Sequence, residues 1–153
     1  MSNINFLTQE VPQLLKGLDE DAKPEWGTMN AGQMLDHLRR GVVLSVTNLE
    51  DEVLTPDDKL PGFKRYLMSS KPFVPHSKKP AVYDTVEEST NPFPALKEEL
   101  MERVEWMIEY FNANPNHIAV HPNFGHLNGE EWLQLHYKHF THHFTQFALI
   151  KIS

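Results

Sequence analysis

The stretch from Trp132 to Ile150 contains no glycine or proline, and its apolar side chains recur at helical spacing. Asn128-Gly-Glu-Glu131 precedes it and resembles a capping box, in which the first and fourth side chains each accept the other's backbone N–H. We therefore expect a long C-terminal helix. On a helical wheel, one sector of about 100° holds Trp132, His136, His139, Phe140, His143, Phe147 and Ile150.

This sector should face the core, because tryptophan and phenylalanine dominate it. A buried imidazole needs a partner for each ring nitrogen, and three imidazoles on adjacent turns cannot easily satisfy one another. A divalent cation would satisfy them. His139 and His143 stand at i and i+4, the spacing that lets two imidazoles converge on one ion. His142 lies off the sector, and we expect it to flank the site or to be exposed.

The same spacing occurs in the His-Glu-x-x-His motif of metallopeptidases. Here Phe140, Thr141 and His142 stand between the two histidines, so the glutamate that serves as general base is missing. This chemistry excludes a zincin-type peptidase.

A third ligand is expected from a second helix, which starts near Asn30 and ends near Leu49. His37 is the best candidate, because it shares the inward face of that helix with Met34 and Leu38. His136 is the alternative third ligand. Otherwise it would contact a ligand histidine or line the entrance of the pocket. Gln146, one turn beyond His143, would either hydrogen-bond a ligand or lie at the surface as a free amide.

Two more helices are predicted, over about Phe6–Leu18 and from Pro94 to Asn114. Roughly forty proline-broken residues separate the second helix from the third, and short strands are possible there, for example around Val82 and Tyr83. The expected fold is an all-α four-helix bundle with a long crossover between helices two and three, in a single domain over residues 1–153.

Composition narrows the chemistry. The chain has 153 residues, nine histidines and no cysteine, so imidazole or carboxylate groups must hold any metal. Its net charge of −7 disfavours nucleic acid as a partner. The N-terminal residues do not resemble a signal peptide and no apolar run is long enough to span a membrane, so we expect a soluble cytoplasmic protein without a membrane partner.

Several other polar side chains could have more than one role. Lys64, Arg65 and Lys71 could hold a carboxylate over the site, although a solvated loop is the more ordinary interpretation. We expect Asp36 to be solvated. His121 and His126 flank a Pro-Asn-Phe-Gly turn, and they would serve that turn or line the mouth of the pocket.

These residues also resemble a known family. His139-Phe-Thr-His142-His143-Phe-Thr-Gln146 looks like the H-x-x-H-H-x-x-Q signature of the DinB/YfiT-like metalloenzymes. The segment from Trp26 to His37-Leu resembles the Trp…His-Leu segment that opens their second helix. The stretch His121–Trp132 is similar to an uncharacterised bacterial branch, and the resemblance spans roughly Trp26 to Ile150.

The resemblance implies a four-helix bundle in which His37, His139 and His143 bind a divalent metal. Some members are similar to thiol-S-transferases, which add a low-molecular-weight thiol across an electrophile, and others resemble hydrolases or isomerases. This chain departs from the familiar members in one respect, because Phe144 and Thr145 stand where they carry an Arg-Gly pair.

The sequence thus predicts a metal-dependent enzyme, a transferase or a hydrolase, that acts on a small molecule. The ion would be zinc, nickel or iron. For a transferase, the resemblance implies a low-molecular-weight thiol as one possible second substrate, and a homodimer is one possible assembly. The alternative is a non-catalytic bundle that uses its metal pocket for ligand binding or stress sensing. No general acid or base is identified.

Overall fold

Two capping boxes begin the two helices that carry the candidate ligands. In the computed structural model, which describes residues 3–75 and 78–151, Asn30 Oδ1 accepts the Gln33 N–H at 2.7 Å, and Gln33 Oε1 accepts the Asn30 N–H at 2.9 Å. Helix α3 (Ala31–Thr47) starts there. Asn128 and Glu131 make the same pair of bonds, each at 2.9 Å, at the start of α6 (Gly129–Gln146). Both predicted helix starts are confirmed.

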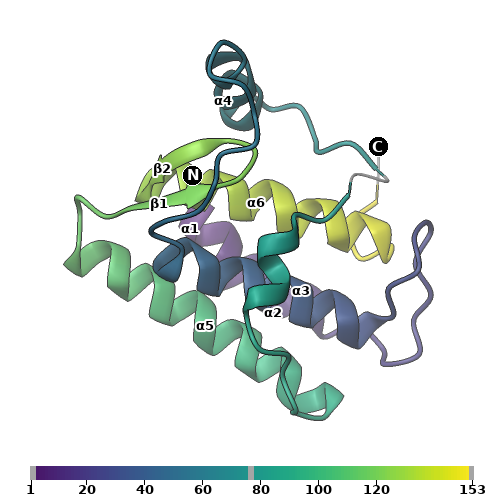
Figure 1. Ribbon diagram of the computed structural model, residues 1–153. Helices are drawn as coiled ribbons and strands as arrows, with labels where there is room; N and C mark the ends of the chain where they lie inside the picture. Colours follow the sequence, from purple (N-terminus) through teal and green to yellow (C-terminus); the bar gives the residue numbers. More distant parts are fainter. Residues whose placement is uncertain (1–2, 76–77, 152–153) are drawn as a thin grey trace.

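The remaining elements surround these two helices (Figure 1). The chain begins with α1 (Asn3–Asn5), the π-helical turn η1 (Phe6–Glu10) and α2 (Val11–Leu15). The crossover holds α4 (Leu60–Met68) and the 3₁₀ helix η2 (Ala81–Thr85). Then follow α5 (Phe93–Ala113), β1 (Ile118–His121) and β2 (Gly125–Asn128).

The expected all-α four-helix bundle is wrong, because the chain contains a β-hairpin. Strands β1 and β2 pair antiparallel, with His121 opposite Gly125, whose φ of +83° suits the turn. The hairpin joins the helices: Val120 N–H donates to Asn48 O at 2.7 Å and Trp132 Nε1 donates to Ala119 O at 3.3 Å. The fold is therefore mixed α and β.

The crossover also differs from its sequence expectation. Val82 and Tyr83 lie in the 3₁₀ helix η2 and not in a strand. Helix α4 was not expected, because Pro61 and Gly62 stand in this nine-residue segment and both residue types disfavour a helix interior. Its position comes from packing on α6, where Leu67 is fully buried.

The core forms where α3 packs between α5 and α6, with the N-terminal helical segment alongside (Figure 1). Its fully buried large side chains include Met34, Leu35, Leu38, Leu100, Met107, Trp132, Phe140 and Phe144. Phe144 is buried although it falls outside the predicted inward sector, because the face of α6 in contact with its neighbours is wider than 100°. Within the described ranges, no helix has the length and apolar character needed to cross a membrane.

Asp36 is a correction to the sequence analysis, which expected it to be solvated. It is 9% exposed, and its carboxylate lies 2.8 Å from Arg39 and 3.1 Å from Arg40. Because charges this buried need a partner, the two arginines account for its position on the α5 and η2 side of α3.

Candidate metal centre

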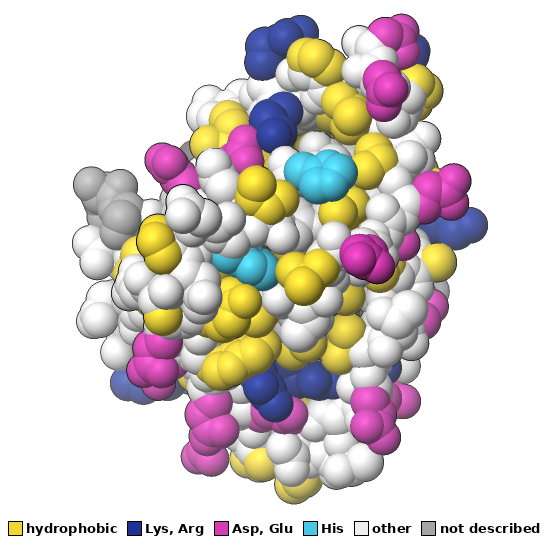
Figure 2. All heavy atoms as spheres, turned by 60° about the vertical axis from the view of Figure 1, so that its left-hand side comes forward, with side chains coloured by type: hydrophobic (Ala, Val, Ile, Leu, Met, Phe, Trp, Pro, Cys, Tyr) yellow, Lys and Arg dark blue, Asp and Glu magenta, His cyan; other side chains and the backbone are white. Residues whose placement is uncertain are grey.

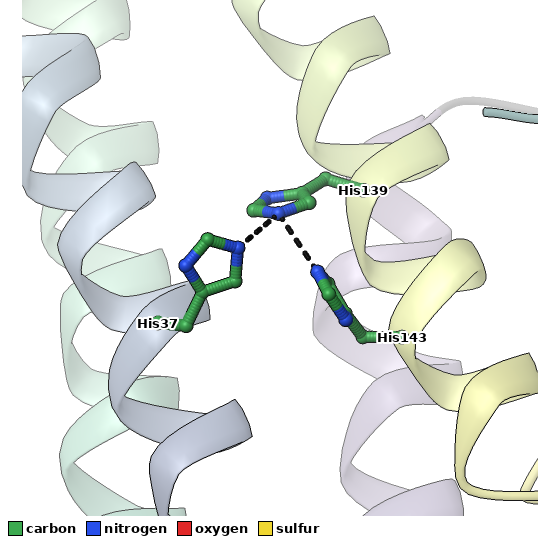
Figure 3. A group of neighbouring side chains, drawn as sticks. All are labelled: His37, His139 and His143. Atoms are coloured by element: carbon green, nitrogen blue, oxygen red, sulfur yellow. Dashed lines mark hydrogen bonds between the residues drawn. The ribbon is translucent and has the colours of Figure 1, made fainter. Parts of the chain in front are cut away.

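Three histidines from two helices meet in the interior. His37 comes from α3, and His139 and His143 come from consecutive turns of α6 (Figure 3). His139 Nε2 lies 2.8 Å from His37 Nε2 and 3.1 Å from His143 Nε2. One ligand atom from each ring lies within 4.8 Å of the others, so the group can hold a metal ion. The structure thus brings together the three residues that the sequence selected.

Two of the nitrogen–nitrogen distances, both at His139 Nε2, are close to those of a tetrahedral site. Metal–nitrogen bonds of about 2.0–2.1 Å imply ligand nitrogens roughly 3.3 Å apart. The two contacts at His139 Nε2 are shorter than this by a few tenths of an ångström. Small side-chain movements would therefore open space for an ion at those two contacts.

All three imidazoles are neutral at pH 7. Burial, together with neighbouring His143, lowers the pKa of His37 to about 2. Burial lowers the pKa of His143 to about 4, and burial with the adjacent imidazoles holds the pKa of His139 well below its usual value. Neutral imidazole is the form that binds a metal. The site therefore offers nitrogen lone pairs without having to lose protons first.

Hydrogen bonds alone do not satisfy the cluster. Gln146 Oε1 lies 2.7 Å from His143 Nδ1 and can only accept, so Nδ1 carries the hydrogen and neutral His143 has a lone pair at Nε2. His139 Nε2 contacts both His37 Nε2 and His143 Nε2. If it carries a hydrogen it can donate to His143 but cannot accept from His37, and if it carries none the contact with His143 has no hydrogen. His37 Nδ1 and His139 Nδ1 are buried without a hydrogen-bond partner among the described residues. A cation at the three Nε2 atoms would resolve the conflict there.

Gln146 connects the cluster to the loop before α3. Its Nε2 donates to Trp26 O at 2.8 Å, and its own backbone O accepts from Glu25 N–H at 2.7 Å. Gly27, with φ of +82°, lies so close that a Cβ there would be 2.8 Å from Gln146 Nε2. Gln146 is 4% exposed, so the surface-amide alternative is excluded.

Tyr83 covers the other side of the cluster. Its ring stacks on His37 with centroids 4.8 Å apart, and a Cβ at Gly41 would lie 3.2 Å from its hydroxyl. Tyr83 is 3% exposed, and burial raises its pKa. The sequence analysis missed this residue, because η2 reaches the site only through the folding of the crossover.

The three histidines line one wall of a cavity of about 600 Å³. On the face shown in Figure 2, hydrophobic side chains gather near histidines, and charged side chains lie around them. The cavity lies between α6, the crossover and the hairpin, and its aromatic lining is formed by Trp26, Phe63, Tyr66, Phe73, Tyr83 and Phe124. Its volume is in the usual range for small-molecule sites. No aspartate or glutamate is among the described residues that line it.

The other histidines of α6 do not belong to the three-histidine group, although the His142 ring contacts the His143 ring edge-on, with centroids 4.9 Å apart. His136 is completely buried against Trp132, with ring centroids 5.7 Å apart, and it does not line the cavity. His142 is half-buried and does line it, with an edge contact to Trp26 at 5.6 Å. His37, and not His136, thus lies where a third ligand would be.

The basic residues at the cavity are not those that the sequence suggested. Lys64 makes an ion pair with Glu131 at 3.1 Å, and neither it nor Arg65 nor Lys71 lines the cavity. Lys78 and Lys79 line it instead. The path of the crossover decides which of these basic side chains reach the cavity, and the sequence pattern did not predict that path.

A family model described as a protein of unknown function, DUF1569, matches residues 4–149. The chain belongs to this family. The match extends from α1 to the residues just after α6, so all three histidines of the cluster are in the DUF1569 region. No curated protein and no solved structure matches the chain.

Proposed function

We propose that this DUF1569 protein is a metal-dependent enzyme that acts on a small molecule. The observation that carries the proposal is the convergence of the His37, His139 and His143 Nε2 atoms at the wall of a cavity of about 600 Å³. Closed four-ligand sites are structural, whereas three protein ligands with a free position are typical of catalytic sites. The cavity provides room for a further ligand and for a substrate.

When bound, a divalent ion supplies Lewis-acid chemistry that lowers the pKa of a coordinated water or thiol. The protein's own residues do the rest. The three neutral imidazoles would hold the ion without cancelling its charge. Gln146 Oε1 accepts the hydrogen of His143 Nδ1, and this bond fixes the tautomer of His143. The aromatic walls exclude water and bind the apolar part of a substrate.

Zinc, nickel or iron would fit this donor set, because imidazole suits all three. Two reaction types agree with an activated water or thiol, namely hydrolysis and the transfer of a low-molecular-weight thiol. The relation to the DinB/YfiT-like metalloenzymes is part of the proposal. Its support is that the motif match and the convergence of Nε2 atoms select the same residues, His37, His139 and His143.

The second candidate function is a non-catalytic metal-dependent binding protein. The observation in its favour is that the described residues lining the cavity include no carboxylate to serve as general base. His142 and Tyr83 are titratable side chains of the cavity lining that contact the ligand histidines, and burial lowers the pKa of the first and raises that of the second.

The first experiment is elemental analysis of protein purified without an affinity tag. We expect about one equivalent of zinc, nickel or iron in the wild type, and its loss in His37→Ala and in His139→Ala. His126→Ala is the matched control, because His126 is exposed on β2. A wild type without metal, or ligand variants that keep it, would contradict the site.

A second experiment separates the two candidate functions. The metal-loaded wild type and His139→Ala are assayed for hydrolysis and for thiol addition to small electrophiles. Turnover that depends on metal and on His139 supports the enzyme. Metal binding with no turnover in either assay favours the binding protein.

A further inference from the structure

His121 ends β1 and is 5% exposed, and its ring lines the same cavity as the three-histidine cluster. The backbone N–H of Asn123 donates to its Nδ1 at 3.0 Å. The turn Pro122-Asn-Phe-Gly125 thus folds back onto the ring. The proposed function makes no use of His121.

The bond from Asn123 determines the tautomer of His121. Because Nδ1 accepts a hydrogen bond, the hydrogen of a neutral ring must be on Nε2. Burial lowers the pKa of His121 to about 4, so the ring is neutral at pH 7. Its Nε2–H makes no hydrogen bond within the described part of the chain, which leaves it as a donor for a ligand.

Aromatic rings continue the cavity wall from His121. Phe124 lies 5.0 Å from the His121 ring, and Phe73 stacks nearly parallel to Phe124, with centroids 6.2 Å apart and planes at 17°. Phe63 contacts Phe124 at 6.3 Å. These apolar faces suit a planar apolar body, which can stack on them.

His121 lies well away from the metal centre. Its ring packs on Trp132 at 5.8 Å. Trp132 precedes His139 by seven residues, which is about 10 Å along α6 at 1.5 Å per residue. The three-histidine cluster and His121 thus lie at different places along the cavity, and aromatic side chains are part of the same lining.

We propose that His121 is a substrate-binding residue whose Nε2–H donates to an acceptor oxygen of the ligand. The ligand class is a small molecule with a planar apolar body, which lies on Phe63, Phe73 and Phe124, and a carbonyl or similar oxygen at His121. This inference deepens the proposed function and rests on it for the identity of the cavity as a substrate site.

The first test is the tautomer of His121, measured by NMR of the ring nitrogens at pH 7. We expect the hydrogen on Nε2 and a hydrogen bond from the Asn123 amide. A hydrogen on Nδ1 would overturn the proposal, and this measurement needs no variant that might misfold.

The second test uses a matched pair of probes, para-fluoroacetophenone and para-fluoroethylbenzene, which differ by one carbonyl oxygen. Fluorine NMR gives the Kd of each for the wild type, for His121→Phe and for His121→Gln. One net hydrogen bond should change the ratio of the two Kd values by roughly three- to tenfold between wild type and His121→Phe. His121→Gln keeps an N–H donor, so it should restore much of the preference.

An unchanged ratio in His121→Phe would overturn the role of His121. Failure of both probes to bind the wild type at millimolar concentration would overturn the ligand class. Both titrations are run on the protein as purified and after chelation. A carbonyl preference that persists without metal supports the His121 site even if the metal-dependent enzyme proves wrong, so the two failures are distinguishable.

Discussion

His143 Nδ1 lies 2.7 Å from Gln146 Oε1, one turn further along α6. The same glutamine donates from its Nε2 to Trp26 O at 2.8 Å, so one buried side chain joins the metal centre to the loop that precedes α3. Since an amide oxygen can only accept, this pair keeps the His143 Nε2 lone pair directed at the cluster.

We expect Gln146→Leu to weaken metal binding by about 10- to 100-fold, the usual effect of losing a partner of a ligand histidine. The physical reason is that the His143 ring loses its fixed tautomer and orientation. Competition with a chromogenic chelator measures the affinity. Gln134→Leu is the matched control on the same helix. Gln134 donates to Leu67 O and Ser69 O and makes no hydrogen bond to the three histidines. Equal affinities for the two variants would contradict the role of Gln146.

Removal of the metal should lower thermal stability. A ligand that binds only the folded state at 100 times its Kd adds about 2.7 kcal/mol. For a domain of this size the corresponding shift in Tm is roughly 5–10 °C. Differential scanning calorimetry with and without EDTA measures it. His139→Ala should show no response to EDTA, and a response equal to that of the wild type would place the metal elsewhere.

His136→Leu should stabilise the protein by about 1 kcal/mol, because both ring nitrogens of His136 are buried without a partner in the described part of the chain. An apolar side chain of similar size removes that cost. Urea unfolding followed by tryptophan fluorescence gives the free energy of unfolding. Metal content should stay at the wild-type level, and its loss would instead identify His136 as a ligand.

The metal-free protein should lose stability as the pH falls from about 6.5 to about 4. Burial lowers the pKa of His121 to about 4 and that of His136 to about 3, against 6.5 for the ordinary side chain. In this window the unfolded chain binds protons that the folded chain does not. Each group therefore contributes a slope of up to about 1.4 kcal/mol per pH unit. Urea unfolding at several pH values should give a shallower slope for His136→Leu than for the wild type. Equal slopes would mean that His136 has the same pKa in the folded and the unfolded chain.

Local sequence patterns predicted the helices around the site well. The capping boxes at Asn30 and Asn128 were found because their bonds join residues three apart in the chain. The common face of His139 and His143 follows from helix geometry alone. For the same reason the sequence could indicate two converging imidazoles before any tertiary structure was known.

Other features of the site depend on contacts between distant segments. The sequence analysis predicts only a turn within the hairpin from Ile118 to Asn128, because four-residue strands carry little periodicity. Strand β1 packs on α3 and β2 packs on α6, and these contacts are between distant segments. Tyr83 and Lys78 reach the cavity only through the path of the crossover. A stronger signal was present in Gly125 after Pro122-Asn-Phe, which is typical of a hairpin turn.

The sequence by itself determined the helix starts, the histidine face of α6 and the exclusion of thiolate ligands, since these follow from residue types and from spacings within one element. Only the tertiary structure decided that His37, 102 residues before His139, lies against it while His136 does not. The tertiary structure also decided the mixed α and β fold, the aromatic cavity and the position of His121 in its wall. The physical reason is that helical periodicity orients a side chain about its own axis, whereas the distance between two elements is set by packing of the whole core.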